Sequence, residues 1–297
     1  MRSAGGPGAE GDDRRDEVAT RALALLAALA IGIQSAPAAD PRLARAAEYI
    51  DRFERDFGQL IGDERYDQHV SGADYPHAER RRTQSEMLFV WMPRQGDWLT
   101  VRNVRSVDGR PIAGSERRLT DAITSTDNPV ARLRQLRDDS ARFNIGRTFR
   151  NINYPTMALH FLEAKNQPRM RFVVEQRDTV AGVDGWRVGF TEQQTPTLVQ
   201  DEHGESLYAH GTVWIADRDG TVLRTRLEIF VASAPTSMSA TVDYGRDAKL
   251  SMWVPRRMRE EYMQRVTEHG SRIAERITAT AIYTNYRRFE TSGRIIR

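Results

Sequence analysis

The chain has 297 residues, 39% of them apolar and 29% charged, which is ordinary for a globular protein and excludes disorder over the whole length. Its formal charge of +3 is small, and its arginines alternate with acids in runs such as RRMREEYMQR, so we expect no nucleic-acid partner. Cysteine is absent, which excludes disulfides, thiolate metal sites, a cysteine nucleophile and a lipid-modified N-terminal cysteine.

Residues 21–40, RALALLAALAIGIQSAPAAD, predict a secretory signal peptide. A lone arginine precedes the apolar stretch 22–33, and small residues follow around Ala36, Ala38 and Ala39. Twelve residues at about 1.5 Å each are too short for a hydrocarbon core of about 30 Å, so a transmembrane helix is disfavoured. We expect cleavage near Ala38 or Ala39 and a periplasmic or secreted protein. The alternative is a buried alanine-rich helix.

Residues 1–17 are too acidic and too long for the usual start of a signal peptide, so we expect the true translation start downstream of Met1. We assign residues 1–39 to the signal peptide and residues 40–297 to one domain. No internal repeat or linker demands a second domain.

An amphipathic helix is predicted at the start of this domain. Asp40 is a good N-cap and Pro41 suits the first helical position, and apolar residues follow at spacings of four, three, three and four. After Gly62 the pattern becomes strand-like, and EMLFVWM with GDWLTVRNV predicts a hairpin. The polar segment between them, SGADYPHAERRRTQ, is predicted to be a mobile loop.

The middle of the chain, about 116–164, predicts a helical insertion. SERRLTDAIT and NPVARLRQLRDDSARFNIG have helical periodicity, and a shorter helix, TMALHFLEA, is expected from Thr156. The inner stripe expected for the second helix is Val130, Leu133, Leu136, Ser140 and Phe143. From Arg169 onward, short apolar runs separated by turn signals predict consecutive antiparallel strands. The predicted fold class is α+β: a large twisted antiparallel sheet with helices against it.

Residues 210–231, HGTVWIADRDGTVLRTRLEIFV, form the clearest predicted hairpin. Alternation gives its return strand one apolar and one wet face. The expected apolar face holds Leu223, Thr225, Leu227, Ile229 and Val231, and the wet face holds Arg224, Arg226 and Glu228. In the outgoing strand, Val213 and Ile215 share one face, and Trp214 and Ala216 the other. The apolar face must be covered by the opening helix, the middle helices or a ligand.

The order of an opening helix and antiparallel strands, with VWIADRDGTVLRTRLEI, then KLSMWVPRRMREEY with its Val254-Pro255 step, and a closing AIYTNYRRF, resembles the periplasmic lipoprotein-carrier (LolA/LolB-like) superfamily. The resemblance covers roughly Asp40 to Arg288. It implies an open half-barrel whose concave apolar face is lidded by helices and holds acyl chains of lipids or lipoproteins. The helices at 40–58 and 116–164 would then form the lid over the concave face. The insertion departs from a minimal carrier, and no receptor-binding or lid-latching residue is carried over.

Apolar and aromatic side chains suffice for an acyl site, and no ionisable group is needed. The residues expected to line it are Phe172, Trp186, Phe190, Trp214, Leu227, Ile229 and Trp253. The alternative for each of them is an ordinary core position.

Metal and catalytic motifs are weak. DRDG at 217–220 has acids like a calcium loop, but Ile215 and Arg226 occupy the positions of the first acid and of the closing glutamate, which favours a plain turn. The loop DEHGESLYAH could hold zinc through Asp201, Glu202, His203, Glu205 and His210, or be merely polar. GxSxG, HExxH and a glycine-rich phosphate loop are absent. We expect no catalytic residue, metal or cofactor.

The sequence thus favours a non-enzymatic, monomeric carrier or sensor of lipid or lipidated protein. Its expected partners are a lipid acyl chain or lipoprotein, with an envelope protein and transient membrane contact as further partners. The alternatives are a protein-interaction module without a ligand cavity and a hydrolase whose distant residues form no recognisable motif.

Overall fold

The computed structural model describes residues 40–72, 75, 77–92, 97–125, 127–148, 150, 153–201, 203–231, 236–268 and 271–289. The chain divides into a first unit, Met1–Ala39, and a second unit, Asp40–Arg297. The first unit, and with it the predicted signal peptide and cleavage site, lies outside the described residues.

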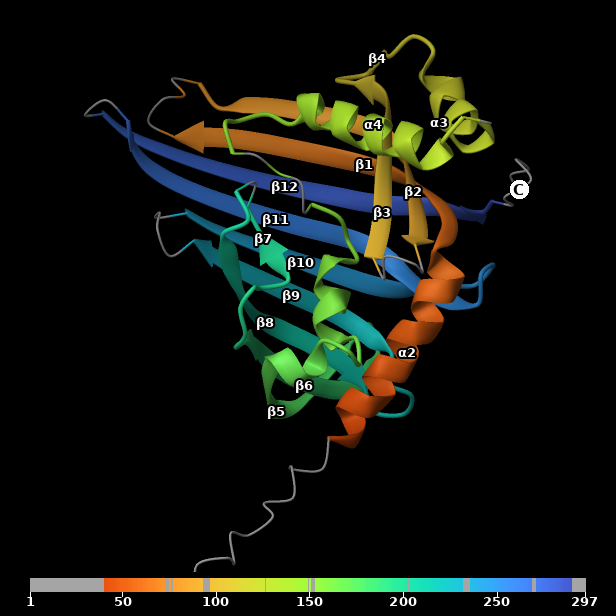
Figure 1. Cartoon of the computed structure of the whole chain (residues 1–297), viewed down its shortest axis with the longest axis vertical. Coiled ribbons are helices and arrows are strands. Elements are labelled where there is room, and N and C mark those ends of the chain that lie inside the picture. The colour runs from red at the N-terminus through yellow and green to blue at the C-terminus, as the bar shows by residue number, and fades with distance from the viewer. Residues whose placement is uncertain are drawn as a thin grey trace, which may run out of the picture. The chain divides into compact units, whose positions relative to one another are not determined.

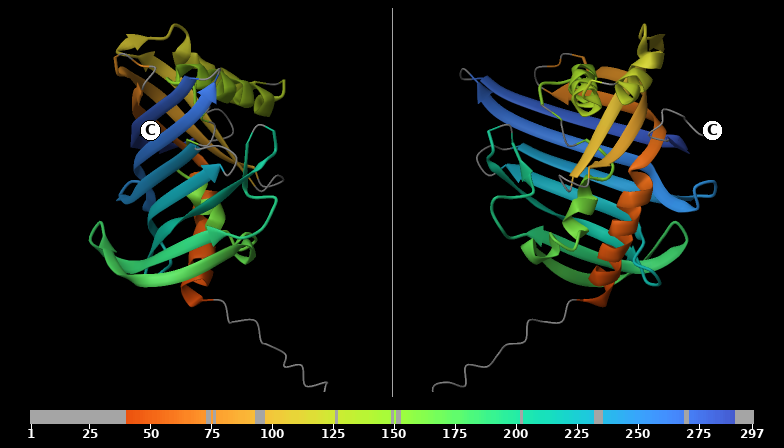
Figure 2. Two further views of the ribbon diagram at one scale, coloured as in Figure 1. Left: turned by 90° about the vertical axis from the view of Figure 1, so that its left-hand side faces the viewer. Right: turned by 45° about the vertical axis from the view of Figure 1, so that its right-hand side comes forward.

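One antiparallel sheet of twelve strands dominates the second unit (Figure 1). The strands are β1 (Gln59–Gly72), β2 (Glu79–Met92), β3 (Asp97–Val107), β4 (Arg110–Pro111), β5 (Met170–Val180), β6 (Val183–Glu192), β7 (Val199–Gln200), β8 (Ser206–Ala216), β9 (Val222–Val231), β10 (Thr236–Asp247), β11 (Met252–Glu268) and β12 (Ser271–Arg288). Their order is β4-β3-β2-β1-β12-β11-β10-β9-β8-β6-β5, with β7 beside β8. The end strands β4 and β5 do not pair, so the twisted sheet is open, and the predicted fold class is confirmed (Figure 2).

Helix α2 (Pro41–Phe57) opens the second unit, as predicted. Its N-cap is Asp40, whose carboxylate accepts a hydrogen bond from the backbone N–H of Arg42 at 2.8 Å. Its apolar stripe is buried, and the Phe57 ring packs on Phe89 of β2 with the ring centroids 4.5 Å apart. This packing holds α2 against the concave face of the sheet.

The helical insertion divides between the two faces of the sheet. α3 (Ser115–Thr124) and α4 (Pro129–Ser140) bury Leu119, Leu133 and Leu136 in a separate core that includes Leu88 of β2. Neighbours of Leu88 along β2 belong instead to the concave-face core, so α3 and α4 lie on the opposite face. After η1 (Ala141–Phe143), η2 (Met157–Leu162) lies on the concave face, followed by η3 (Gln167–Arg169). The cover expected over the concave face is therefore α2 with η2, and the expectation fails for α3 and α4.

Three further expectations need correction. Val130, expected in the inner stripe of α4, is 38% exposed. The helix expected from Thr156 is the 3₁₀ helix η2. β2 begins at Glu79, inside the segment expected to be a mobile loop, and its residues 79–84 pair with β1. These polar residues can form a strand because one face of this part of the sheet is solvated.

The side chain of Val231 lies outside the described residues; the rest of the β8–β9 hairpin has the two faces that its alternation predicts, with one exception. Val213, Ile215 and Leu227 belong to the concave-face core, and Trp214 contacts a small cluster on the other face. The register shifts between Trp214 and Ile215, so a bulge turns Leu223 onto the outer face with Trp214.

Candidate functional site

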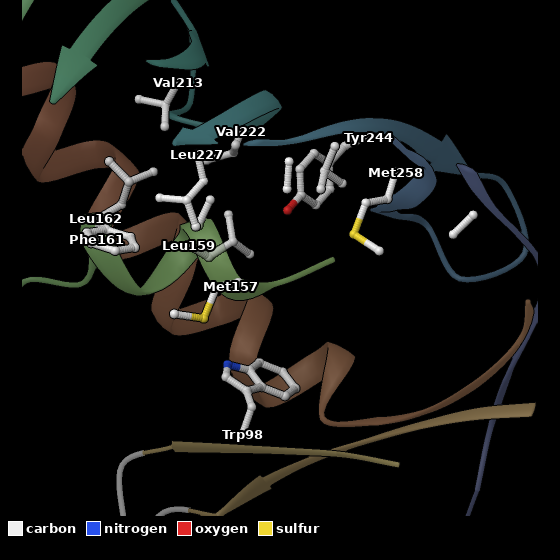
Figure 3. Packing of buried hydrophobic residues seen from close by; sticks show 14 of the residues in the cluster. Trp98, Met157, Leu159, Phe161, Leu162, Val213, Val222, Leu227, Tyr244 and Met258 are labelled. Carbon is white, nitrogen blue, oxygen red and sulfur yellow. The ribbon is translucent and has the colours of Figure 1, made fainter. Parts of the chain in front are cut away.

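The concave face carries an apolar zone beneath α2 and η2. Alternate residues of β6, β8, β9 and β10 form it: Val188, Phe190, Ala209, Val213, Ile215, Leu227, Ile229, Met238, Ala240, Val242 and Tyr244. Leu159, Phe161 and Leu162 of η2 lie between α2 and the strands that bear Val213 and Leu227 (Figure 3). The zone thus spans four strands and is apolar except for the buried Thr225 of β9.

The structure brings most of the predicted lining residues to this zone. Phe190, Leu227 and Ile229 are 2%, 1% and 3% exposed. Phe172 and Trp186 are partly buried around the same core. Trp253 packs against this core and also against the outer cluster that includes Leu223. Trp214 lies on the opposite face, where its indole N–H donates to the Asp178 carboxylate at 2.8 Å. Ligand contact by any of these residues stays a prediction.

The turn of the β8–β9 hairpin contacts α2 directly. Gly220 has a φ of +75°, and a Cβ at this position would lie 2.4 Å from the backbone carbonyl carbon of Arg45. Gln167 of η3 donates to the carbonyl of Leu43 at 2.9 Å. Within the hairpin, the Asp219 carboxylate stabilises the turn because it accepts the backbone N–H of Thr221 at 3.0 Å. The DRDG turn therefore positions α2 over the apolar zone.

A carboxyl cluster joins α2 to η2. The Glu163 carboxylate is 2.6 Å from Nδ1 of His160 and 2.8 Å from Nζ of Lys165. Burial opposes ionisation of Glu163, but its hydrogen bonds and electrostatic interactions with His160 and Lys165 lower its pKa. Burial and the neighbouring Glu163 raise the pKa of Glu54 on α2 to about 8. At neutral pH Glu54 therefore holds a proton between the two elements.

Stability should fall with rising pH because of Glu54. Its pKa is about 8 in the folded protein and near 4.5 when unfolded, so its contribution is fully present below about pH 4.5 and is lost as pH rises through about 8. Replacement of Glu54 by Gln should raise Tm, relative to the natural protein, more at about pH 9 than at about pH 5. Glu48→Gln, at an exposed position of the same helix, is the control. Parallel Tm–pH curves for the natural protein and Glu54→Gln would contradict this assignment.

The other part of the concave face, on β1, β3, β11 and β12, is a polar zone. Arg102 of β3 donates to the Glu64 carboxylate of β1 from Nε at 2.6 Å and from Nη2 at 2.9 Å. It also donates to the carbonyl of Asn153 at 3.1 Å. Asn153 belongs to the crossing segment, residues 143–148, 150 and 153–155, which runs from η1 toward η2.

Arg150 fastens the same crossing segment to β1. Its guanidinium donates to the hydroxyl of Tyr66 at 3.0 Å and to the side-chain oxygen of Gln68 at 2.7 Å. Tyr66 in turn donates to the Glu260 carboxylate at 2.6 Å. Burial raises the pKa of Glu260, although Tyr66 and the nearby guanidinium oppose this. The chain's own polar groups therefore occupy this part of the concave face, which the sequence did not predict.

The loop suspected of binding zinc forms a turn. The Asp201 carboxylate accepts the backbone N–H groups of His203 and Glu205 at 2.9 and 2.8 Å. The His210 ring stacks on Phe230 with the ring centroids 5.1 Å apart. Within the described residues, which do not include Glu202, no three His, Asp or Glu side chains lie together as metal ligands.

Fold and site together define an open antiparallel half-barrel with a covered apolar concave face. Solved structures of similar arrangement include a domain from Vibrio parahaemolyticus assigned to outer membrane lipoprotein sorting (10% identity, TM-score 0.35, 83% of this chain and 91% of that one). A DUF1329 family protein from Desulfovibrio piger (9%, 0.36, 83% and 93%) and a LolA superfamily protein from Nitrosomonas europaea (10%, 0.31, 82% and 94%) are also similar. The superfamily that the sequence resembles is thus among the similar structures, but none of them supports a function for this chain.

No protein-family model matches the sequence, and no curated protein does. Among the described residues, no helix has both the length and the apolar character needed to span a bilayer.

Proposed function

We propose that the protein is a non-enzymatic carrier or sensor that binds the acyl chain of a lipid or lipidated protein between the apolar zone and its cover of α2 and η2. One observation carries the proposal: an apolar zone on four strands of an open sheet is covered by the helices α2 and η2. The cover meets the sheet through side-chain packing and turn contacts, so it can separate without breaking a strand pair. We further propose that the protein acts in the periplasm or outside the cell, after removal of the signal peptide.

Hydrophobic transfer is sufficient for such binding. Each methylene moved out of water contributes about 0.8 kcal/mol, so half of a ~16-carbon chain gains about 6 kcal/mol before binding costs. The polar zone would not accept a hydrocarbon chain, because its buried carboxylates and guanidiniums would lose their partners. The ligand therefore belongs under α2 and η2, near Phe190, Leu227 and Ile229.

Protein purified without detergent from its own host should carry lipid. Native mass spectrometry is expected to show an added mass that organic extraction removes, and the stripped protein should take up a fluorescent fatty acid. Recovery without lipid, together with no uptake of the fluorescent fatty acid, would contradict the carrier function.

Locking α2 should block uptake. The chain has no cysteine, so the double variant Arg45→Cys with Asp219→Cys places the only two thiols on α2 and on the turn that contacts it. Oxidation is expected to abolish fatty-acid uptake, and reduction to restore it. The single-cysteine variants are the controls, and a thiol assay confirms the cross-link. Equal uptake by oxidised and reduced protein would show that α2 does not move for binding.

A protein-interaction module is the second candidate. Tight packing on the apolar zone favours it, since the rings of Phe161 and Phe190 stack with their centroids 5.1 Å apart. In this case the concave face is only a core, and the stripped protein would take up no fatty acid in either redox state.

A further inference from the structure

A buried threonine interrupts the apolar zone. Thr225 of β9 lies between Val213 of β8 and Val242 of β10, both of which belong to the concave-face core. It is 0% exposed, and among the described residues its hydroxyl has no hydrogen bond of normal geometry. A buried hydroxyl that gives up its water without gaining a partner lowers stability. Thr225 therefore occupies a position where valine, of the same shape, would stabilise the fold better.

Two tyrosines lie near the Thr225 hydroxyl. Tyr244 of β10 is beside it, and the Tyr244 hydroxyl donates to the carbonyl of Pro155 at 2.8 Å. Tyr49 of α2 is connected to Tyr244 through Phe53: the ring centroids of Tyr49 and Phe53 are 6.0 Å apart, and those of Phe53 and Tyr244 6.4 Å. The Tyr49 hydroxyl is buried, and it too lacks a partner within the part of the chain that the structure describes. One unpaired hydroxyl from the sheet and one from the cover thus lie around Tyr244.

Both unpaired hydroxyls are available as donors. Burial raises the pKa of Tyr49 above its usual value of about 10, and the negative charge of Asp219 raises it further, so Tyr49 keeps its proton. A threonine hydroxyl also keeps its proton and can rotate to suit an acceptor. Burial and the charge of Asp219 disfavour an ionised carboxylate in the same place. A neutral carbonyl oxygen, which only accepts, is the group that fits two such donors.

We propose that the hydroxyls of Thr225 and Tyr49 bind the ester carbonyl of an acylated ligand. This inference rests on the proposed function and names the chemical class of its ligand: an acyl chain that ends in an ester, as in a glycerolipid, rather than a free fatty acid. An ester brings acceptors alone, whereas an amide brings an N–H that needs a further partner. The hydrocarbon chain lies on the apolar zone, and the ester bridges α2 and β9. A bound ester gives both hydroxyls the partner that the described part of the chain does not supply.

Replacement of Thr225 by Val removes the hydroxyl and keeps the shape of the side chain. The variant is compared with the natural protein in its binding of three pyrene-labelled probes of equal chain length: a methyl ester, the carboxylic acid and the plain alkane. Thr225→Val is expected to bind the methyl ester roughly tenfold more weakly, since the carbonyl loses its donor in a buried site. Binding of the alkane should change less than about twofold, because it depends on the apolar zone alone. Tyr49→Phe should lower the affinity for the ester in the same selective way.

Thr83→Val is the matched control. Thr83 of β2 is 1% exposed, and its hydroxyl likewise has no partner among the described residues, but it lies opposite Tyr66 of the polar zone. Both valine variants should keep or raise Tm, because each removes a buried unpaired hydroxyl. Only Thr225→Val should lose affinity for the methyl ester.

Binding of the alkane separates the ester site from the carrier function. If the natural protein binds none of the probes, both are overturned. If it binds the alkane, and Thr225→Val weakens ester binding no more than Thr83→Val does, the carrier function stands and the ester site is overturned. Tighter binding of the ionised carboxylic acid than of the methyl ester by the natural protein would also overturn the ester site. Selective loss of ester binding in Thr225→Val supports it.

Discussion

Replacement of Arg102 by Met is expected to lower the free energy of unfolding by about 3–5 kcal/mol. Arg102 and Glu64 are 8% and 2% exposed, and they form a two-point ion pair between β3 and β1. Without the guanidinium, the Glu64 carboxylate stays buried without its counter-charge, and the carbonyl of Asn153 loses a donor. Equilibrium unfolding in urea measures the effect.

Two controls separate the buried pair from its components. Met at both Arg102 and Glu64 removes both charges together, so the double variant should be more stable than Arg102→Met alone. Arg226→Ala breaks a pair whose side chains are 50% and 27% exposed, and should cost less than about 1 kcal/mol. A loss in Arg102→Met no larger than that in Arg226→Ala would show that the polar zone is solvated.

Replacement of Gly220 by Ala is expected to cost about 2–5 kcal/mol of unfolding free energy. Part of this cost is the φ of +75°, which side chains disfavour. The rest arises because the added methyl group would lie 2.4 Å from the backbone carbon of Arg45, so α2 must shift. Urea unfolding gives the energy, and faster uptake of a fluorescent fatty acid would report the displaced helix.

Gly182 provides the matched control for this substitution. Its φ is +76°, nearly that of Gly220, but no atom lies within 4 Å of where its Cβ would be. Gly182→Ala should therefore cost only the backbone component, about 1 kcal/mol. Equal losses at the two glycines would mean that the hairpin turn does not hold α2.

Local patterns predicted the elements with one apolar face. The spacing of Leu43, Ile50 and Phe57 gives the α2 stripe, and alternation around Leu227 gives the concave face of β9, because both depend only on side-chain periodicity. The position of Leu223 could not be predicted in this way, since one bulge reverses the alternation.

The sequence contains a local signal for the face of the sheet that α3 and α4 cover. EMLFVWM in β2 is apolar without alternation, a pattern typical of strands buried on both faces. Leu88 indeed packs under α3 and α4, and Phe89 packs under α2. The polar zone had no local signal, because Tyr66 and Glu260 are 194 residues apart and only the sheet pairing brings them together.

The pairing of β1 with β12 also bears on how the chain folds (Figure 1). Every other neighbouring pair in the main sheet joins consecutive strands or spans only β7, and so closes a short loop. The first strand meets its second partner only when residues 271–288 have left the ribosome, more than 200 positions later. Until then the hairpins of each half expose unpaired edges, and a nascent chain of this kind is a natural client for a chaperone.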